Sequence, residues 1–335
     1  MALPYLRHAA VLMRLSRRPR QRVLARAVIG AALALGLSGC GGGASMHQGS
    51  AEATVPPATS AAVAGKVAQV LQELGAERLY VMASDNIIHS GLGVVSPNGL
   101  EPANTTPRVR LLSNVSSNGR TVVLGAAGVT DGFFLDGAYQ LVGDRLVTLT
   151  AAGDQKYSLT VSSDGTIAAV GATGFFTRAP GATRWKRDRR LAHAELVEVA
   201  WGEGGRAYTV QHSGTPRAQL WEVSTGKPPR RLRPAPCARA TIPAPTREMA
   251  VTDVERERPG CKQTSRSHLI DLTGHHRDRL LPAGWDPLTW SRDSSVVLLA
   301  RGHEIAVWQV ASGELTDRVD LGVRIWMAAP LWSEG

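Results

Sequence analysis

The segment LWEVSTGK, residues Leu220–Lys227, returns in altered form as VWQVASGE at Val307–Glu314. Each copy places a tryptophan in an apolar segment that leads into a glycine turn, and Trp221 and Trp308 are 87 positions apart. A looser copy, HLIDLTG at His268–Gly274, lies between them. Self-similarity with a period of about 20–50 residues is typical of solenoids and propellers. We call this repeated segment the strand pattern.

A second pattern, the turn pattern, precedes the strand pattern. AWGEGGRAYTV begins at Ala200 and TWSRDSSVVLL at Thr289, while NVSSNGRTVVLGA (Asn114–Ala126) and TVSSDGTIAAVGA (Thr160–Ala172) are looser copies. LGAERLYVMAS (Leu74–Ser84) is interpreted as a degenerate copy. The turn residues lie 40 to 47 positions apart, at Gly75, Gly119, Gly165, Gly205, roughly Arg247 and Ser294. That spacing is close to the period of about 40–45 residues of a four-stranded propeller blade.

The apolar segments are short, rich in β-branched residues and bounded by Gly, Asp, Asn and Ser, as strands joined by tight turns are. A single blade cannot bury both faces of its sheet, whereas a ring of blades buries them against one another. We therefore predict an all-β propeller of about six four-stranded blades, with five or seven blades as alternatives. Trp221 and Trp308 would occupy matching places on equivalent strands. A β-sandwich is the main competing fold, and an α/β fold is disfavoured because long amphipathic helices are missing between the strands.

In these repeats the chain resembles WD-repeat and related bacterial periplasmic propellers, over about residues 65–335. Blades of those proteins carry a Trp-Ser-x-Asp-Gly turn and a later Trp-Asp strand. Here only Asp164-Gly165 supplies the Asp-Gly pair, and Trp-Asp is replaced by Trp221-Glu222 and Trp308-Gln309. The His–Asp hydrogen-bond network of eukaryotic WD repeats is therefore not expected.

The two ends of the repeat region predict how the ring closes. LWSEG (Leu331–Gly335) looks like a further turn pattern, so we predict that its strand joins the N-terminal blade. The other strands of that blade would come from Glu77–Gly91. Before it, KVAQVLQEL has apolar residues at helical spacing, which predicts a short helix packed against the ring. Those residues are Val67, Val70, Leu71 and Leu74.

The N-terminus reads as a targeting segment. Residues 1–26 carry seven arginines and no acidic residue, and an apolar run follows from Ala27 to Cys40. This run is shorter than the roughly 20 residues that span a membrane, and the arrangement is typical of an export signal. Its end, Leu37-Ser38-Gly39-Cys40, resembles a bacterial lipobox, which implies that Cys40 is lipidated, with palmitate as the expected type of acyl group, and becomes the first mature residue. SRRPRQ (Ser16–Gln21) leaves the general secretory and twin-arginine routes open.

These features divide the chain into three parts. We predict a lipoprotein signal peptide at 1–39, a lipidated cysteine with a flexible Gly-, Ser- and Pro-rich linker at 40–63, and the propeller domain at 64–335. The resemblance to lipoproteins implies an extracytoplasmic protein, anchored by lipid to the outer face of the bacterial plasma membrane.

Charge and cysteines limit the partners. The formal net charge is +10, but seven arginines belong to the leader, so no nucleic-acid partner is expected. If Cys40 carries lipid, Cys237 and Cys261 remain, and disulfides persist outside the cytoplasm. We predict a Cys237–Cys261 disulfide, with two free thiols as the alternative.

No catalytic, cofactor-binding or metal-binding residue is assigned from motifs. The sequence lacks nucleophile-elbow, zinc-protease, P-loop and calcium-loop patterns. His275-His276, with Asp271 and Asp278 nearby, is interpreted as an exposed turn rather than a metal site. A lactonase-like propeller enzyme would need carboxylates that converge in the central channel. The candidates are Asp85, Asp131, Asp136 and Asp253.

Two basic stretches, Thr183–His193 and Lys227–Arg239, are interpreted either as contacts with anionic lipid or acidic wall polymer, or as solvated loops. The leading hypothesis is a non-catalytic recognition or scaffold module for an envelope or membrane protein or a glycan. It resembles the propeller part of actinobacterial lipoproteins that act beside membrane sensor proteins, without their extra N-terminal domain. The alternatives are a metal-dependent hydrolase with a channel site and a propeller that serves only as a spacer.

Overall fold

The computed structural model describes residues 61–84, 91–106, 109, 111–127, 135–150, 156–171, 174–188, 196–223, 227–256, 258–261, 266–275 and 277–333. All of them belong to one compact unit, Glu52–Gly335. They form six antiparallel sheets of four strands each, together with helix α3 (Ala61–Leu74) and a short 3₁₀ turn at Glu203–Gly205. The prediction of an all-β propeller with six blades is therefore confirmed.

Each blade is one four-stranded sheet, whose strands follow one another from the centre of the ring outward. Blade 1 contains β24 (Ile325–Trp332), β1 (Ala76–Ala83), β2 (Gly91–Ser96) and β3 (Gly99–Pro102), and blade 2 contains β4 (Leu111–Ser117), β5 (Val122–Ala127), β6 (Leu135–Val142) and β7 (Arg145–Thr148). Blade 3 contains β8 (Lys156–Val161), β9 (Ile167–Gly171), β10 (Gly174–Arg178) and β11 (Lys186–Asp188), and blade 4 contains β12 (Leu196–Trp201), β13 (Ala207–Gln211), β14 (Gln219–Val223) and β15 (Arg230–Pro234). Blade 5 contains β16 (Ala238–Pro243), β17 (Met249–Val254), β18 (His268–Asp271) and β19 (Arg279–Leu280), and blade 6 contains β20 (Asp286–Trp290), β21 (Val296–Arg301), β22 (Glu304–Gln309) and β23 (Leu315–Asp320).

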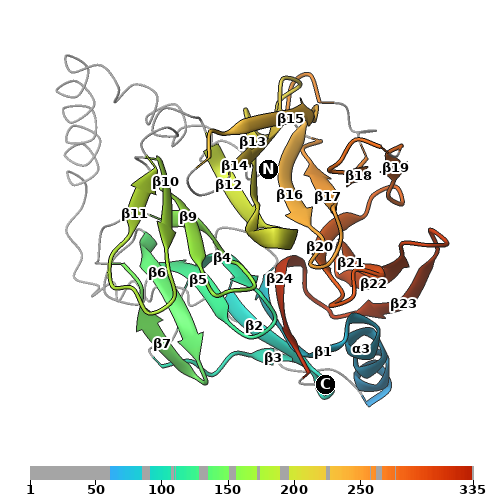
Figure 1. The fold of residues 1–335 in the computed structure, drawn as a ribbon. Helices are drawn as coiled ribbons and strands as arrows, with labels where there is room; N and C mark the ends of the chain where they lie inside the picture. Colours follow the sequence, from blue (N-terminus) through green and yellow to red (C-terminus); the bar gives the residue numbers. More distant parts are fainter. Residues whose placement is uncertain are drawn as a thin grey trace, which may run out of the picture. The chain divides into compact units, whose positions relative to one another are not determined.

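The innermost strands stand side by side around the centre of the ring (Figure 1). β4 contacts β8, β8 contacts β12, and the series continues through β16, β20 and β24 back to β4. Because each of these strands starts a blade, the residues along them line the central channel.

The hydrophobic core is divided among the interfaces between blades. In β21, Val297 and Leu299 pack against blade 5, whereas Val296 and Leu298 pack against blade 1 and α3. This alternation follows from the two-residue period of a strand, which sends successive side chains to opposite faces of the sheet. The described residues contain six such clusters, one for each pair of neighbouring blades.

The turn pattern forms the connection between the first and second strands of a blade. In blade 3 the Asp164 carboxylate accepts hydrogen bonds from the Ser162 hydroxyl and from Thr166 N at 3.0 Å, while Gly165 has φ +83°. The Ser162 hydroxyl, followed by the amide of Thr166, lowers the pKa of Asp164. Blade 6 repeats the arrangement at Asp293, with φ +61° at Ser294. The polar residues of the pattern therefore cap the turn.

The predicted helix is confirmed, and it begins at Ala61, within the predicted linker. Its apolar residues Val67, Val70, Leu71 and Leu74 are buried between blades 6 and 1. Gly75 ends this helix with φ +63°, and its amide donates to Gln72 O. The apolar part of Leu74–Ser84 forms β1, which takes the second place in blade 1 as the strand after a turn pattern does, but Gly75 follows a helix because the innermost place in this blade belongs to β24.

Ring closure follows the prediction. β24 pairs with β1 in an antiparallel register that places Trp332 opposite Ala76 and Ile325 opposite Ala83. Blade 1 is therefore assembled from the two ends of the described chain.

Trp221 and Trp308 lie on equivalent strands, as predicted: β14 and β22 are the third strands of blades 4 and 6. The HLIDLTG copy supplies β18, the third strand of blade 5. Trp308 is 1% exposed and belongs to the core between blades 5 and 6, but Trp221 is only half-buried and belongs to none of the described core clusters. The two positions are thus equivalent in topology and unequal in packing.

Candidate functional site

The six innermost strands enclose a cavity of about 610 Å³. Every blade contributes residues to its wall, mostly from the innermost strands and the turns that follow them. This central channel is the place where side chains from all blades meet, so it is the candidate functional site.

Tryptophans line the channel at several points. Trp201, Trp290 and Trp332 are the last residues of β12, β20 and β24, and Trp326 is the second residue of β24. Trp290 is buried and its Nε1 donates to Ile242 O at 2.8 Å, whereas the other three are half-buried and their Nε1 atoms have no hydrogen-bond partner within the described residues. The Arg324 guanidinium stacks on Trp326, 3.9 Å from the ring centroid.

On one side of the channel, polar side chains are satisfied by the neighbouring blade. Asn114 Oδ1 accepts from Leu159 N at 3.0 Å, Ser158 Oγ accepts from Val199 N at 3.2 Å, and Thr160 Oγ1 accepts from Trp201 N at 3.3 Å. These bonds join the innermost strands of blades 2, 3 and 4. This part of the wall is held together by its own polar groups.

Blade 5 presents a different wall, with an ion pair and two unpaired oxygens. Arg239 Nε and Nη2 donate to Asp253 Oδ2 at 3.0 and 2.6 Å. Asp253 Oδ1 and Thr241 Oγ1 are buried and have no partner within the described residues. Buried polar groups without a partner are uncommon in native proteins, so this wall has hydrogen-bonding capacity that the described residues do not use.

Opposing effects act on the pKa of the Asp253 carboxyl in this wall. Burial raises the pKa of Asp253, and the adjacent Arg239 guanidinium opposes that rise. A second ion pair, between Arg256 and Asp286 at 2.5 Å, lies close enough for Asp286 to raise the pKa of Asp253 further. The site therefore holds two ion pairs beside the channel.

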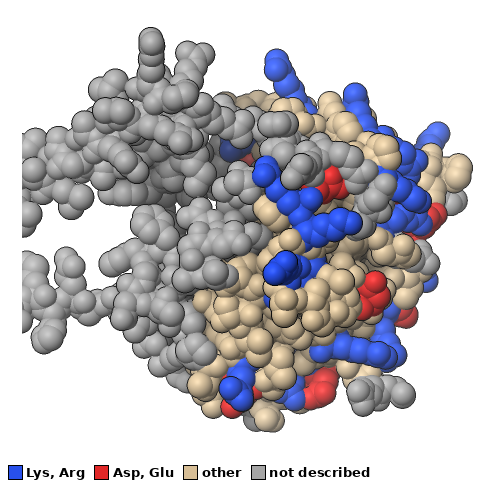
Figure 2. Space-filling view, turned by 60° about the vertical axis from the view of Figure 1, so that its left-hand side comes forward, with Lys and Arg blue, Asp and Glu red and all other residues tan. Residues whose placement is uncertain are grey.

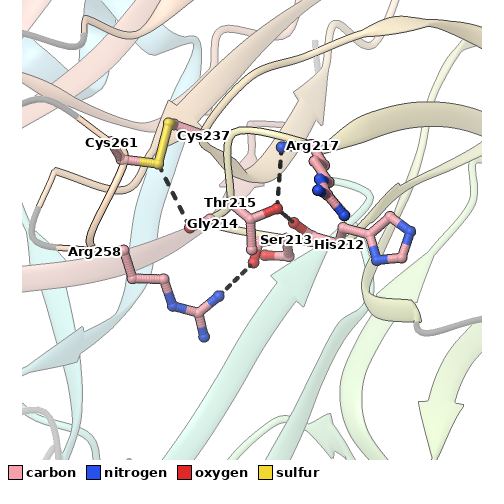
Figure 3. The surroundings of a disulfide bond; sticks show 8 residues. All are labelled: His212, Ser213, Gly214, Thr215, Arg217, Cys237, Arg258 and Cys261. Carbon is pink, nitrogen blue, oxygen red and sulfur yellow. Dashed lines mark hydrogen bonds between the residues drawn. A yellow bond between two sulfur atoms is a disulfide. The ribbon is translucent and has the colours of Figure 1, made fainter.

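The predicted disulfide is confirmed next to this wall (Figure 3). Cys237 and Cys261 have a Cα–Cα distance of 5.7 Å, and Cys237 immediately precedes β16. Cys237 O accepts from Glu255 N at 2.8 Å, just beyond β17. This hydrogen bond joins the ends of the strands that carry Arg239 and Asp253, and the bridge links the start of β16 to the segment after β17.

A turn of blade 4 packs on the disulfide. The Cys261 sulfur lies 3.7 Å from Gly214 O, and Arg258 Nη1 donates to Ser213 O at 3.1 Å (Figure 3). Ser213 Oγ in turn donates to Arg239 O at 2.7 Å. The disulfide, the turn and the channel arginine form one continuous set of contacts.

The structure places only one of the four candidate carboxylates. Asp253 lines the channel, but Asp85 and Asp131 fall outside the described residues, and Asp136 lies in β6 with a side chain that is not described. No group of three His, Cys, Asp or Glu that could hold a metal occurs among the residues that the structure describes.

The histidine cluster behaves as a turn. The Asp271 carboxylate accepts from Thr273 N and His275 N, both at 2.8 Å, and His275 is exposed; His276 lies outside the described residues. Cys40 also lies outside them, so its lipidation stays a prediction. None of the described helices is both long and apolar enough to cross a membrane.

The chain is similar to several hundred solved protein chains, among them the following three. A chain in the crystal structure of a nidogen/laminin complex matches with a TM-score of 0.55 and 8% identity, over 75% of this chain and 97% of that chain. A putative TolB from Agrobacterium tumefaciens gives 0.48 and 14%, over 65% and 94%, and apo AztD from Citrobacter koseri gives 0.41 and 10%, over 71% and 68%. No protein-family model and no curated protein sequence matches the chain. The nidogen/laminin match, at 8% identity, bears on the fold alone.

Proposed function

We propose that this protein is a non-catalytic recognition module whose central channel binds a hydroxyl-rich ligand, a glycan of the cell envelope. The observation that carries the proposal is the wall of blade 5, where Thr241 Oγ1 and Asp253 Oδ1 are unpaired within the described residues, beside a channel lined by tryptophans. Ligand sites commonly combine aromatic side chains with a few convergent polar groups.

The chemistry of a sugar suits this wall. Sugar hydroxyls both donate and accept hydrogen bonds, so a ligand that displaces the side chains covering these two buried oxygens can donate to Asp253 Oδ1 and pair with Thr241. The half-buried rings of Trp201, Trp326 and Trp332 offer apolar faces against which the C–H face of a sugar can pack. The Arg239–Asp253 ion pair holds the carboxylate in place for this contact.

The described channel gives less support to a metal-dependent hydrolase. Such an enzyme needs several carboxylate, His or Asn ligands around one ion. Asp253 already shares one oxygen with Arg239 and belongs to no metal-binding group of acids and histidines in the described part of the chain. An envelope protein seated at the channel mouth remains the alternative occupant for a binding module.

The proposed location is the outer face of the bacterial plasma membrane, with lipid on Cys40 as the anchor. The arginine-rich leader, the lipobox-like Leu37–Cys40 and the Cys237–Cys261 disulfide support it, since structural disulfides are characteristic of exported proteins. Cys40→Ala should move the protein from the membrane fraction to the soluble fraction. An unchanged membrane fraction would contradict lipid as the sole attachment.

The channel is tested with soluble oligosaccharides released from bacterial cell walls, titrated against the purified protein by calorimetry and tryptophan fluorescence. Saturable binding is expected. Thr241→Val should weaken it about tenfold, because one hydrogen bond to the ligand is lost. The same change should leave the free energy of unfolding unchanged or increase it, because the hydroxyl has no partner within the described residues.

Thr316→Val is the matched control. Thr316 Oγ1 is also buried and unpaired within the described residues, but it lies in β23, away from the channel. This variant should bind like the wild type. Equal binding by both variants, or no binding of any oligosaccharide, would overturn the glycan proposal. A stoichiometric divalent metal in the purified protein would favour the hydrolase, and a specific protein crosslinked in intact cells would favour the protein-binding alternative.

A further inference from the structure

A second hollow lies on the outer rim, away from the channel. It is a cleft of about 520 Å³ between β15 of blade 4 and the segment Asp271–Asp278 of blade 5. Four arginines line it: Arg230, Arg231 and Arg233 come from β15, and Arg277 comes from the opposite wall. Its two walls thus belong to different blades.

Two of these arginines are already paired. Arg233 binds Asp278 with two hydrogen bonds, Nη1 to Oδ1 at 2.7 Å and Nη2 to Oδ2 at 2.6 Å, and this pair joins the two walls. Arg230 Nη2 donates to Glu222 Oε2 at 2.8 Å. The charges of both arginines are therefore largely balanced by the protein.

The other two are not balanced. Arg231 and Arg277 are exposed, and neither has a hydrogen bond or ion pair within the described residues. The remaining acid in the cleft, Asp271, is occupied by Thr273 and by the His275 amide. These donors are neutral and leave the charge of Asp271 in place, so outside its two ion pairs the cleft holds two arginines against one carboxylate and keeps a net charge of +1.

The positive charge continues along one side of the ring. Lys and Arg side chains gather in the upper part of the face shown in Figure 2. We counted the charged residues in the outermost strand of each blade together with the four residues before that strand, within the described sequence. Basic residues outnumber acidic ones in blades 3, 4 and 5. In blades 1, 2 and 6 the acidic residues equal or exceed the basic ones. The residues are Arg184, Lys186, Arg187, Lys227, Arg230, Arg231, Arg233, Arg277 and Arg279 against Asp188 and Asp278 in the first group, and Arg145 and Arg318 against Glu101, Asp144, Glu314, Asp317 and Asp320 in the second.

We propose that this cleft binds a phosphate group of a phosphodiester-linked anionic polymer. Guanidinium groups bind phosphate through paired hydrogen bonds. A planar carboxylate is saturated by one such fork, whereas a phosphate offers oxygens in several directions and can be held by Arg231 from one wall and Arg277 from the other. A polymer also has further phosphates for the basic rim on either side. A flat lipid surface would meet the rim but would not fill a recessed cleft.

The test uses the full mature chain and a linear polyphosphate as the probe, with affinity measured over a range of salt concentrations. The double variant Arg231→Gln/Arg277→Gln should bind at least tenfold more weakly and show a shallower dependence of affinity on salt, because fewer counterions are released. Both residues are exposed, so thermal unfolding should not change. Inorganic phosphate should compete for the wild-type site.

Arg145→Gln is the control, because Arg145 is an exposed arginine on the outer strand of blade 2. It should bind polyphosphate like the wild type. An equal loss in this variant would overturn the proposal by showing diffuse charge attraction. Equal affinity for polygalacturonate, a carboxylate polymer, would overturn the choice of phosphate. Binding to vesicles of phosphatidylglycerol that depends on both cleft arginines, without polyphosphate binding, would assign the cleft to the membrane instead.

Discussion

Gly119 and Trp332 touch where the ring closes. Trp332 N donates to Gly119 O at 2.9 Å, and the indole ring occupies the place where a side chain on Gly119 would be, 1.9 Å from Cε3 to an ideal Cβ position. Gly119 also has φ +89°. The turn of blade 2 is thus shaped to receive β24, the innermost strand of blade 1.

Gly119→Ala should therefore lower the free energy of unfolding by more than the cost of a non-glycine residue at a positive φ alone. A positive φ costs a non-glycine residue about 1–2 kcal/mol, and displacement of the ring should add about 1–3 kcal/mol. Gly165→Ala is the matched control, since Gly165 has φ +83° and its added Cβ would meet only Pro180, with Cγ at 3.4 Å. Denaturant unfolding of both variants gives the comparison. Equal losses would mean that the Trp332 ring does not brace the closure.

Trp308→Ala and Trp221→Ala should differ, although the sequence predicts equal roles. Removing the buried Trp308 should cost about 3–5 kcal/mol, as expected for a fully buried aromatic residue. Removing the half-buried Trp221 should cost less, because its side chain buries less apolar surface when the protein folds. Chemical denaturation of the two variants measures both values. A larger loss for Trp221 would contradict the difference in packing between the two rings.

Reduction of the Cys237–Cys261 disulfide should lower the free energy of unfolding by about 3 kcal/mol, since the bridge closes a loop with a sequence separation of 24 residues. The experiment is made in a Cys40→Ala background, so that only these two cysteines can supply thiols. A Cys237→Ser/Cys261→Ser variant should show the same loss and no response to reductant. Two titratable thiols in the unreduced, denatured protein would refute the bridge.

His268 should make the protein less stable in mild acid. Burial lowers the pKa of this half-buried imidazole below its ordinary value of 6.5, and Arg233 and Arg266 lower it further while Asp278 opposes them. Because the unfolded chain then binds the proton more readily, the stability contribution is present above pH 6.5 and is lost as the pH falls through the lowered pKa. The free energy of unfolding, measured with urea, should differ less between neutral and mildly acidic pH for His268→Gln than for the wild type. An unchanged pH dependence in the variant would remove His268 from this account.

The repeated turns made the architecture predictable. Asp164-Gly165 and Asp293-Ser294 lie about three blade periods apart because blades 3 and 6 cap the turn between their first and second strands in the same way. Ring closure was predictable for the same reason, since Trp332-Ser333 repeats the start of that turn pattern. Gly75 looked like a turn between two strands and instead ends helix α3, because a helix end and a tight turn both demand a positive φ.

The channel wall was not predictable to the same degree. Asp253 was one of four carboxylate candidates, but its pairing with Arg239 depends on the register between β16 and β17, which places Asp253 opposite Ala240. Thr241 carries no sequence signal at all, because its importance comes from an unpaired hydroxyl in a particular place among the described residues. Convergence of single residues from different strands is a property of the assembled ring.

The pairing of β24 with β1 also has a consequence for biosynthesis. During translation, β1–β3 emerge long before Ile325–Trp332, so the inner edge of β1 lacks its partner until nearly all of the described chain has been made. An open strand edge invites pairing with other chains, and contacts between distant parts of a sequence slow folding. The nascent chain therefore stays incompletely folded for a prolonged time. A chaperone or an export receptor has more time to bind it than to bind a protein whose first domain folds at once.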